Sequence, residues 1–159
     1  MRIIVFADTH GNYPEAVKAV DSAEPVDLII HLGDELQDAD AIGIATGVPL
    51  LVVAGNCDPS HPAPREQCVE LAGVRVFMTH GDRYLVKAGM ANLMKKALAE
   101  KARVALFGHT HLPLIQDLEG VLLVNPGTLS NRGSSKSYAL LTIHNGSVTA
   151  RLITLPPAD

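Results

Sequence analysis

Short apolar runs recur along the first two thirds of the chain, each rich in branched residues and too short for a typical helix. They predict buried strands at residues 3–7, 28–32, 50–54, 74–79 and 104–108. Because these runs are continuously apolar and do not alternate with polar residues, we expect a sheet that is covered on both faces.

Helical spacing of apolar residues separates these runs. It predicts helices over residues 13–23 and 86–100, with a weaker pattern over residues 38–45. The last third changes character, and residues 121–124, 138–143 and 148–153 are predicted as antiparallel strands, the last two joined by a hairpin at Asn145-Gly146. The chain is therefore expected to be one α/β domain, residues 1–159, whose last third consists of β-strands.

Composition narrows the class of protein. Of the 159 residues, 47% are hydrophobic and 19% are charged, which excludes a largely disordered chain. Seventeen acidic against thirteen basic residues give a net charge of −4, which argues against tight nucleic-acid binding. No apolar run approaches the roughly 20 residues that cross a bilayer, and Asp8 interrupts the first one. We expect a cytoplasmic protein that does not bind membranes, and a homo-oligomer remains open.

Polar clusters follow the predicted strands, at the point where each strand ends. The clusters are Asp8-Thr9-His10-Gly11-Asn12, Gly33-Asp34, Gly55-Asn56-Cys57-Asp58, His80-Gly81-Asp82 and Gly108-His109-Thr110-His111. Ligands of open α/β sheets gather at the carboxyl ends of strands, so these clusters are expected to converge. Imidazole, carboxylate and amide oxygen bind first-row divalent ions. Seven candidate ligands exceed what one ion normally takes, which favours two ions roughly 3.5–4 Å apart.

The order and spacing of these motifs resemble the calcineurin-like metallophosphoesterase superfamily. The motifs are Asp8-x-His10, Gly33-Asp34, Gly55-Asn56, His80 and Gly108-His109-x-His111. The small size and the segment Gly55-Asn56-Cys57-Asp58 look like its compact YfcE-type phosphodiesterases. The resemblance implies an α/β fold in which a two-sheet β sandwich is flanked by helices, a single domain of four layers.

The resemblance also implies a ligand set. One metal ion would be held by Asp8, His10, Asp34 and His111, and a second by Asp34, Asn56, His80 and His109, with Asp34 as the bridge. Manganese is the preferred expectation for the two divalent ions, with nickel, iron and zinc as alternatives. The implied activity is hydrolysis of a small phosphodiester or nucleotide by in-line attack of a metal-bridging hydroxide. Asp34, Asn56 and His109 are the catalytic candidates.

Cys57 departs from the wider superfamily, in which many members have His after the Gly-Asn pair. A thiol is a weak hydrogen-bond donor and cannot replace an imidazolium, which casts doubt on monoester hydrolysis. Cys57, Asn56 and Arg132 are the substrate-binding candidates, Arg132 because it follows a loop, Asn125-Pro126-Gly127-Thr128, that resembles one of the compact subgroup. Asp58 is expected either to orient a metal-binding histidine or to cap the following turn.

A second class of function fits the same resemblance. A eukaryotic retromer subunit similar to this subgroup binds protein partners, so a non-catalytic metal-binding scaffold is the alternative. A degenerate scaffold can lose ligands at one metal position, whereas all seven candidate positions are filled in this chain.

Overall fold

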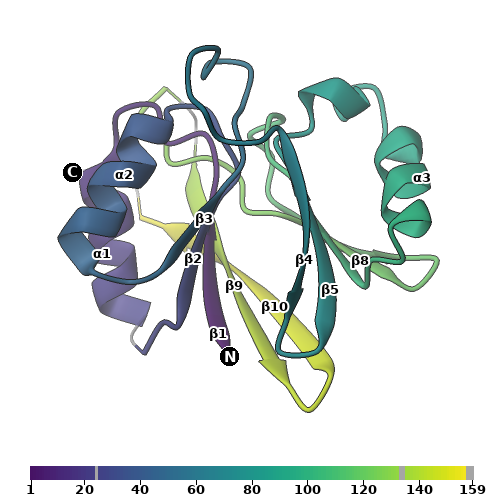
Figure 1. Cartoon of the computed structure of the whole chain (residues 1–159). Coiled ribbons are helices and arrows are strands. Elements are labelled where there is room, and N and C mark those ends of the chain that lie inside the picture. Colours follow the sequence, from purple (N-terminus) through teal and green to yellow (C-terminus); the bar gives the residue numbers. More distant parts are fainter. Residues whose placement is uncertain (24, 133–134, 157–159) are drawn as a thin grey trace.

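Two five-stranded sheets form the centre of the computed structural model, which describes residues 1–23, 25–132 and 135–156 (Figure 1). The first sheet has the order β10-β9-β1-β2-β3 and is built from β1 (Arg2–Phe6), β2 (Leu28–His31), β3 (Leu50–Val52), β9 (Lys136–His144) and β10 (Ser147–Leu155). The second has the order β4-β5-β6-β8-β7 and is built from β4 (Glu66–Leu71), β5 (Val74–Thr79), β6 (Val104–Leu106), β7 (Leu114–Leu118) and β8 (Val121–Asn125).

The alternation of side chains along each strand divides the core into layers. In β1, Ile3 and Val5 belong to the apolar core shared by the two sheets, whereas Ile4 and Phe6 pack with residues of α1 (Tyr13–Ala23) and α2 (Leu36–Thr46). On the second sheet, Phe77 packs with α3 (Ala91–Ala99). Figure 1 shows α1 and α2 beside the first sheet and α3 beside the second. This helix–sheet–sheet–helix order confirms the expected four-layer fold and explains the continuously apolar strands.

The bounds of these three helices agree with the predicted ranges to different degrees. The first spans the predicted residues, and the second is longer than its weak pattern indicated. The third begins at Ala91 instead of residue 86, because Leu85 has φ 54° and Gly89 has φ 146°, values that an α-helix does not admit. A short 3₁₀ helix, Asp82–Tyr84, precedes this break. Among the helices described, none is long and apolar enough to span a membrane.

The sequence analysis did not predict two of the strands, and it predicted the pairing of a third only in part. Strands β4 and β7 lie at the two edges of the second sheet, where half-exposed polar residues interrupt the apolar pattern. Strand β8 was expected to be an antiparallel strand like the last two, which is correct on one side only. It pairs in parallel with β6, with Val104 opposite Leu122, and antiparallel with β7. The hairpin between β9 and β10 is confirmed, with positive φ at both Asn145 and Gly146.

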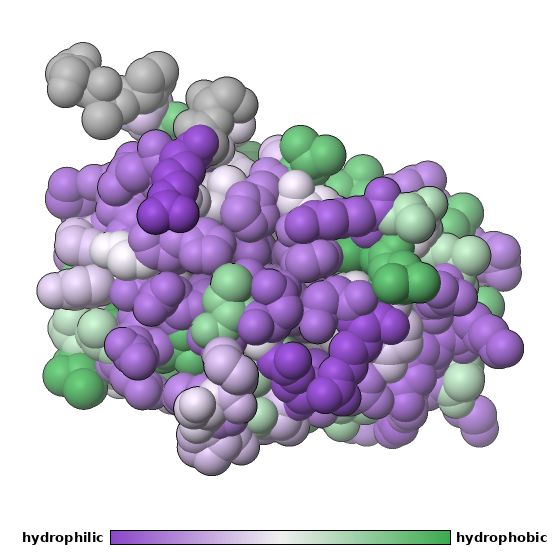
Figure 2. Space-filling model, turned by 90° about the horizontal axis from the view of Figure 1, so that it is seen from above, coloured by the Kyte–Doolittle hydropathy of each residue, from purple (hydrophilic) through white to green (hydrophobic). Residues whose placement is uncertain are grey.

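The parallel strands of both sheets end at one face of the molecule. Strands β1, β2 and β3 run in parallel, as do β5, β6 and β8. Their carboxyl ends point to the top of Figure 1, and Figure 2 views this face, which is largely hydrophilic. The fold therefore places the polar clusters of distant segments on one surface.

Candidate metal centre

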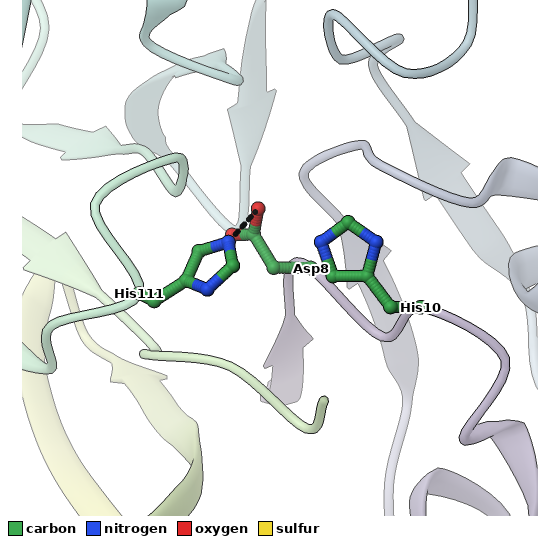
Figure 3. A group of neighbouring side chains, drawn as sticks. All are labelled: Asp8, His10 and His111. Carbon is green, nitrogen blue, oxygen red and sulfur yellow. Dashed lines mark ion pairs between the residues drawn. The ribbon is translucent and has the colours of Figure 1, made fainter. Parts of the chain in front are cut away.

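Six of the seven candidate ligands form two compact groups of donor atoms. Asp8, His10 and His111 make up the first group, and Asp34, His80 and His109 the second. Within each group the potential ligand atoms lie within 4.8 Å of one another. Figure 3 shows the carboxylate of Asp8 between the imidazoles of His10 and His111.

Asp8 carries a buried oxygen that accepts no hydrogen bond from the described residues. Its Oδ2 accepts a hydrogen bond of 3.0 Å from the backbone N–H of His109, but its Oδ1 accepts none. The Oδ1 atom instead faces Nε2 of His111 at 3.1 Å. A buried carboxylate oxygen without a donor is costly, and a cation at this position would satisfy it.

The second group surrounds Nε2 of His80. Oδ1 of Asn56 lies 3.1 Å from this nitrogen, and Nδ1 of His109 lies 3.2 Å from it. Oδ2 of Asp34 follows at 3.4 Å. On the other side of the ring, Nδ1 of His80 donates to the carbonyl oxygen of Leu32 at 2.8 Å, which leaves Nε2 directed at the group. Asn56, the seventh candidate, therefore joins the second group.

Electrostatics favour positive charge at the centre. Burial opposes the charge on His80, but its hydrogen bond with Asp34 and the charge of Asp8 raise the pKa of its imidazole. Burial also disfavours the Asp34 carboxylate, yet the hydrogen bond with His80 and that imidazole's charge lower its pKa below the usual range. Burial and the neighbouring charge of His80 lower the pKa of His109. The N- and O-donor set, with its buried orphan oxygen, thus fits divalent metal ions, which would take the place of the protons.

The backbone at the candidate ligands adopts a rare conformation. Asp8, His10, Asp34, His109 and His111 all have φ between 45° and 66°, the left-handed region that residues with a Cβ seldom occupy. Such strain persists where the surroundings enforce it, and it concentrates at functional sites. Local spacing in the sequence does not reveal these angles.

Close backbone approach explains the glycine of the Gly-Asn pair. A Cβ atom added to Gly55 would lie 2.2 Å from Oδ1 of Asp34. Only a residue without a side chain leaves this carboxylate in place.

Asp58 holds the loops of the second group together. Its Oδ2 accepts hydrogen bonds from the N–H groups of Asp34 and Gly55, at 2.7 and 2.8 Å. Its Oδ1 accepts from Glu35 and Leu36 at the start of α2, at 2.9 and 2.8 Å. The side chain thus caps a helix that precedes it in sequence, which differs from both expectations for Asp58. Three of the four partners lie more than twenty residues away and gave no local signal.

A second support of the same kind was missed by the sequence analysis. The Thr128 hydroxyl, which is buried, donates to the backbone oxygen of Asp8 at 2.7 Å. It also accepts from the N–H of Ser130 at 3.0 Å. Thr128 thereby ties the loop after β8 to the strained residue at the end of β1.

The remaining candidates lie at the rim of the centre. Cys57 is exposed, and its backbone N–H donates to Oδ1 of Asp34 at 2.8 Å. Desolvation and the adjacent Asp34 carboxylate raise the pKa of its thiol to about 11 in the metal-free chain. Arg132 is exposed on the loop after Ser130, with its backbone N–H bonded to that hydroxyl at 3.2 Å. Its role in substrate binding stays a prediction.

Comparison with known proteins agrees with this architecture. The probable metallophosphoesterase YsnB of Bacillus subtilis is 31% identical over 154 residues, which cover 95% of this chain and 89% of that protein. The phosphodiesterase YfcE of Escherichia coli is 28% identical over 168 residues, covering 89% of this chain and 87% of YfcE. The crystal structure of a predicted phosphoesterase from Streptococcus pneumoniae superposes with a TM-score of 0.81 at 28% identity, covering 96% of this chain and 88% of that one.

A more distant match is similar in fold alone. Vps29 from Entamoeba histolytica superposes with a TM-score of 0.76 at 17% identity, covering 98% of this chain and all of that one. The family model of the calcineurin-like phosphoesterase superfamily domain matches residues 1–146. Since that match takes in every strand from β1 to β9 and all the loops of the candidate centre, the chain belongs to the calcineurin-like phosphoesterase superfamily.

Proposed function

We propose that this protein is a dinuclear metal-dependent phosphodiesterase that hydrolyses small phosphodiesters or nucleotides. The observation that carries the proposal is the pair of adjacent donor groups, each with carboxylate and imidazole, around the unpartnered Oδ1 of Asp8. The relative YfcE is itself named a phosphodiesterase.

Each residue has a defined task in this proposal. Asp8, His10 and His111 would hold one ion, Asn56, His80 and His109 would hold the other, and Asp34 would be shared by both. When bound, the ions supply a water acidified enough to attack phosphorus, and they neutralise charge on the phosphoryl oxygens. Manganese is the proposed metal, with nickel, iron or zinc as alternatives.

The chain's own groups keep the ligands in position. The backbone N–H of Cys57 holds one oxygen of Asp34, so that the other oxygen faces the second group. The backbone carbonyl oxygen of Leu32 accepts a hydrogen bond from Nδ1 of His80, which directs Nε2 of the ring at the second group. Groups positioned in advance need no reorganisation during the reaction, which is the main source of such catalysis.

Diesters are the proposed substrates because the rim lacks an imidazole where Cys57 stands. A neutral thiol donates weakly, and general acid catalysis of the kind it would have to supply is worth roughly 10²–10⁴-fold. Arg132 and Asn56 are the proposed contacts of the substrate phosphate.

The test compares bis-p-nitrophenyl phosphate with p-nitrophenyl phosphate. Metal-stripped protein is reconstituted with manganese, nickel or zinc, and metal content is measured beside turnover. We expect metal-restored hydrolysis of the diester with little of the monoester. Asp34→Asn should lose activity and metal, whereas Asp21→Asn, the same change on the exposed side of α1, should lose neither.

Three other results would each revise the proposal. Preference for the monoester would show that another group replaces the missing imidazole. An Asp34→Asn variant with full metal content and activity would refute the bridging role. Two bound ions without turnover of either substrate would favour the scaffold alternative.

A further inference from the structure

A pocket of about 520 Å³ opens between residues 86–90, which directly precede α3, and the loop that carries His109 and His111. It is lined by Val86, Lys87, Met90, Phe107, Thr110, Leu112, Pro113 and Leu114. We call it the α3-side pocket. Its volume lies within the range of roughly 300–1,000 Å³ that small-molecule sites occupy.

The α3-side pocket adjoins the loop that carries two candidate ligands of the metal centre. Thr110, which lines the pocket, stands between the candidate ligands His109 and His111 in the chain. Lys87 lines the same pocket as Thr110, and its side chain is exposed. A phosphate anion bound at the centre would therefore have a positive charge on the pocket side of its binding site.

The lining of the α3-side pocket selects an apolar occupant. Apart from Lys87 and Thr110, every lining side chain is apolar. The Thr110 hydroxyl already accepts hydrogen bonds from the Asn125 amide at 3.0 Å and from the N–H of Leu112 at 3.2 Å. A hydroxylated substituent would lose its bonds to water here with little in return.

The opposite rim of the centre has a different character. A smaller hollow of about 310 Å³ lies beside Cys57, with Glu35, Gln37, Ser60 and His61 among its lining residues. Figure 2 shows a hydrophobic patch on the right of this face, the side on which α3 lies in Figure 1. A diester has two substituents, and of these two hollows the one on the α3 side is the more apolar.

We propose that the α3-side pocket binds an uncharged aromatic substituent of the phosphodiester, with Lys87 paired to its phosphate. This inference rests on the phosphodiesterase function proposed above and adds a substrate class to it. Aromatic rings suit the pocket because they bury a large apolar area at low cost in conformational freedom.

The experiment uses two anions that differ in one group, methyl phenylphosphonate and methyl methylphosphonate, whose methoxide is a poor leaving group. They are titrated into zinc-reconstituted protein, and binding is followed by NMR at the Met90 methyl group. We expect the phenyl compound to shift this signal and to bind at least roughly tenfold more tightly than the methyl compound.

Two variants that each add a carboxylate test whether the pocket, and not the metal centre, causes the preference for the phenyl compound. Leu112→Glu places a carboxylate at the pocket wall, and the 69% exposure of Leu112 makes the change compatible with folding. Ile44→Glu makes the same change on α2, beside the other sheet, where the residue is 85% exposed. Leu112→Glu should abolish the preference for phenyl, and Ile44→Glu should keep it. Lys87→Met should weaken both anions, with Lys87→Arg restoring them.

The results distinguish failure of this inference from failure of the proposed function. Equal affinity for the two anions, or an unchanged phenyl preference in Leu112→Glu, overturns the pocket assignment even if the wild-type protein hydrolyses diesters. Selective phenyl binding without hydrolysis of any diester upholds the pocket assignment and overturns the enzymatic role.

Discussion

Replacement of Asp58 by Asn tests whether one carboxylate holds the candidate centre in shape. In the folded chain, Oδ1 and Oδ2 of Asp58 each accept two backbone hydrogen bonds, at 2.7–2.9 Å, and the side chain is nearly buried. An asparagine has one acceptor oxygen, and its NH₂ group would face two N–H donors. Because a hydrogen bond to a charged group contributes about 1.5–3 kcal/mol, we expect a loss of about 3–5 kcal/mol in the free energy of unfolding.

Urea unfolding of the metal-free protein, followed by circular dichroism, measures this loss. Calorimetric titration with zinc should also show a metal affinity lower by about 10–100-fold, because the clamp positions the Asp34 loop. Asp117→Asn is the matched control, since its exposed carboxylate accepts one bond of 3.3 Å from Gly120. That variant should stay within about 0.5 kcal/mol of the wild-type protein. A loss below about 1 kcal/mol in Asp58→Asn, with unchanged zinc affinity, would refute the clamp.

Three further predictions concern the same loops and the strand beneath them. Gly55→Ala should reduce metal content sharply, because its Cβ would lie 2.2 Å from Oδ1 of Asp34. Gly43→Ala, inside α2 with its nearest neighbour at 3.4 Å, should bind metal normally, and equal metal content in the two variants would contradict the steric argument. Burial lowers the pKa of His31 to about 4, so this ring binds a proton at a lower pH in the folded state than in the unfolded chain. The contribution of His31 to the free energy of unfolding should therefore fall by up to about 3 kcal/mol as the pH is lowered from 6.5 to 4. NMR of the metal-free protein should then show no titration of this ring above pH 5, and a midpoint near 6.5 would be inconsistent with its burial. Thr128→Val should cost about 1–3 kcal/mol in urea unfolding by leaving two buried backbone groups unpaired, and a neutral effect would mean that water replaces the hydroxyl.

Local pattern predicted that the strands are covered on both faces, whereas the arrangement of two sheets in four layers was implied by the resemblance to a known family. Continuously apolar strands require covering on both faces, and the amphipathic helices each have one apolar face with which to cover them. The partners of a strand are a different matter, because they depend on contacts between distant segments. Val121–Asn125 has the same local pattern whether it pairs with β6 or with a later strand, and the edge strands lack a pattern that distinguishes them from loops.

The same distinction applies to the candidate centre. Residue type and position after a strand were enough to select the side chains that the structure brings together, because parallel strands end at one edge. The supports of these side chains were not accessible in this way. Asp58 acts through its carboxylate on three consecutive N–H groups of an earlier loop, and Thr128 acts on the carbonyl of a residue 120 positions away.

Strain in the ligand loops links stability to function in this fold. Five candidate ligands have left-handed φ angles, and each such residue costs of order 1–3 kcal/mol. The cost is borne because the strands beneath are buried in apolar layers, and because Asp58 and Thr128 hold the loops where hydrogen bonds compensate. The unpartnered Oδ1 of Asp8 shows that this compensation is incomplete in the metal-free chain. A cation at that oxygen would complete it, so the arrangement that destabilises the metal-free protein is the one that prepares it to bind metal.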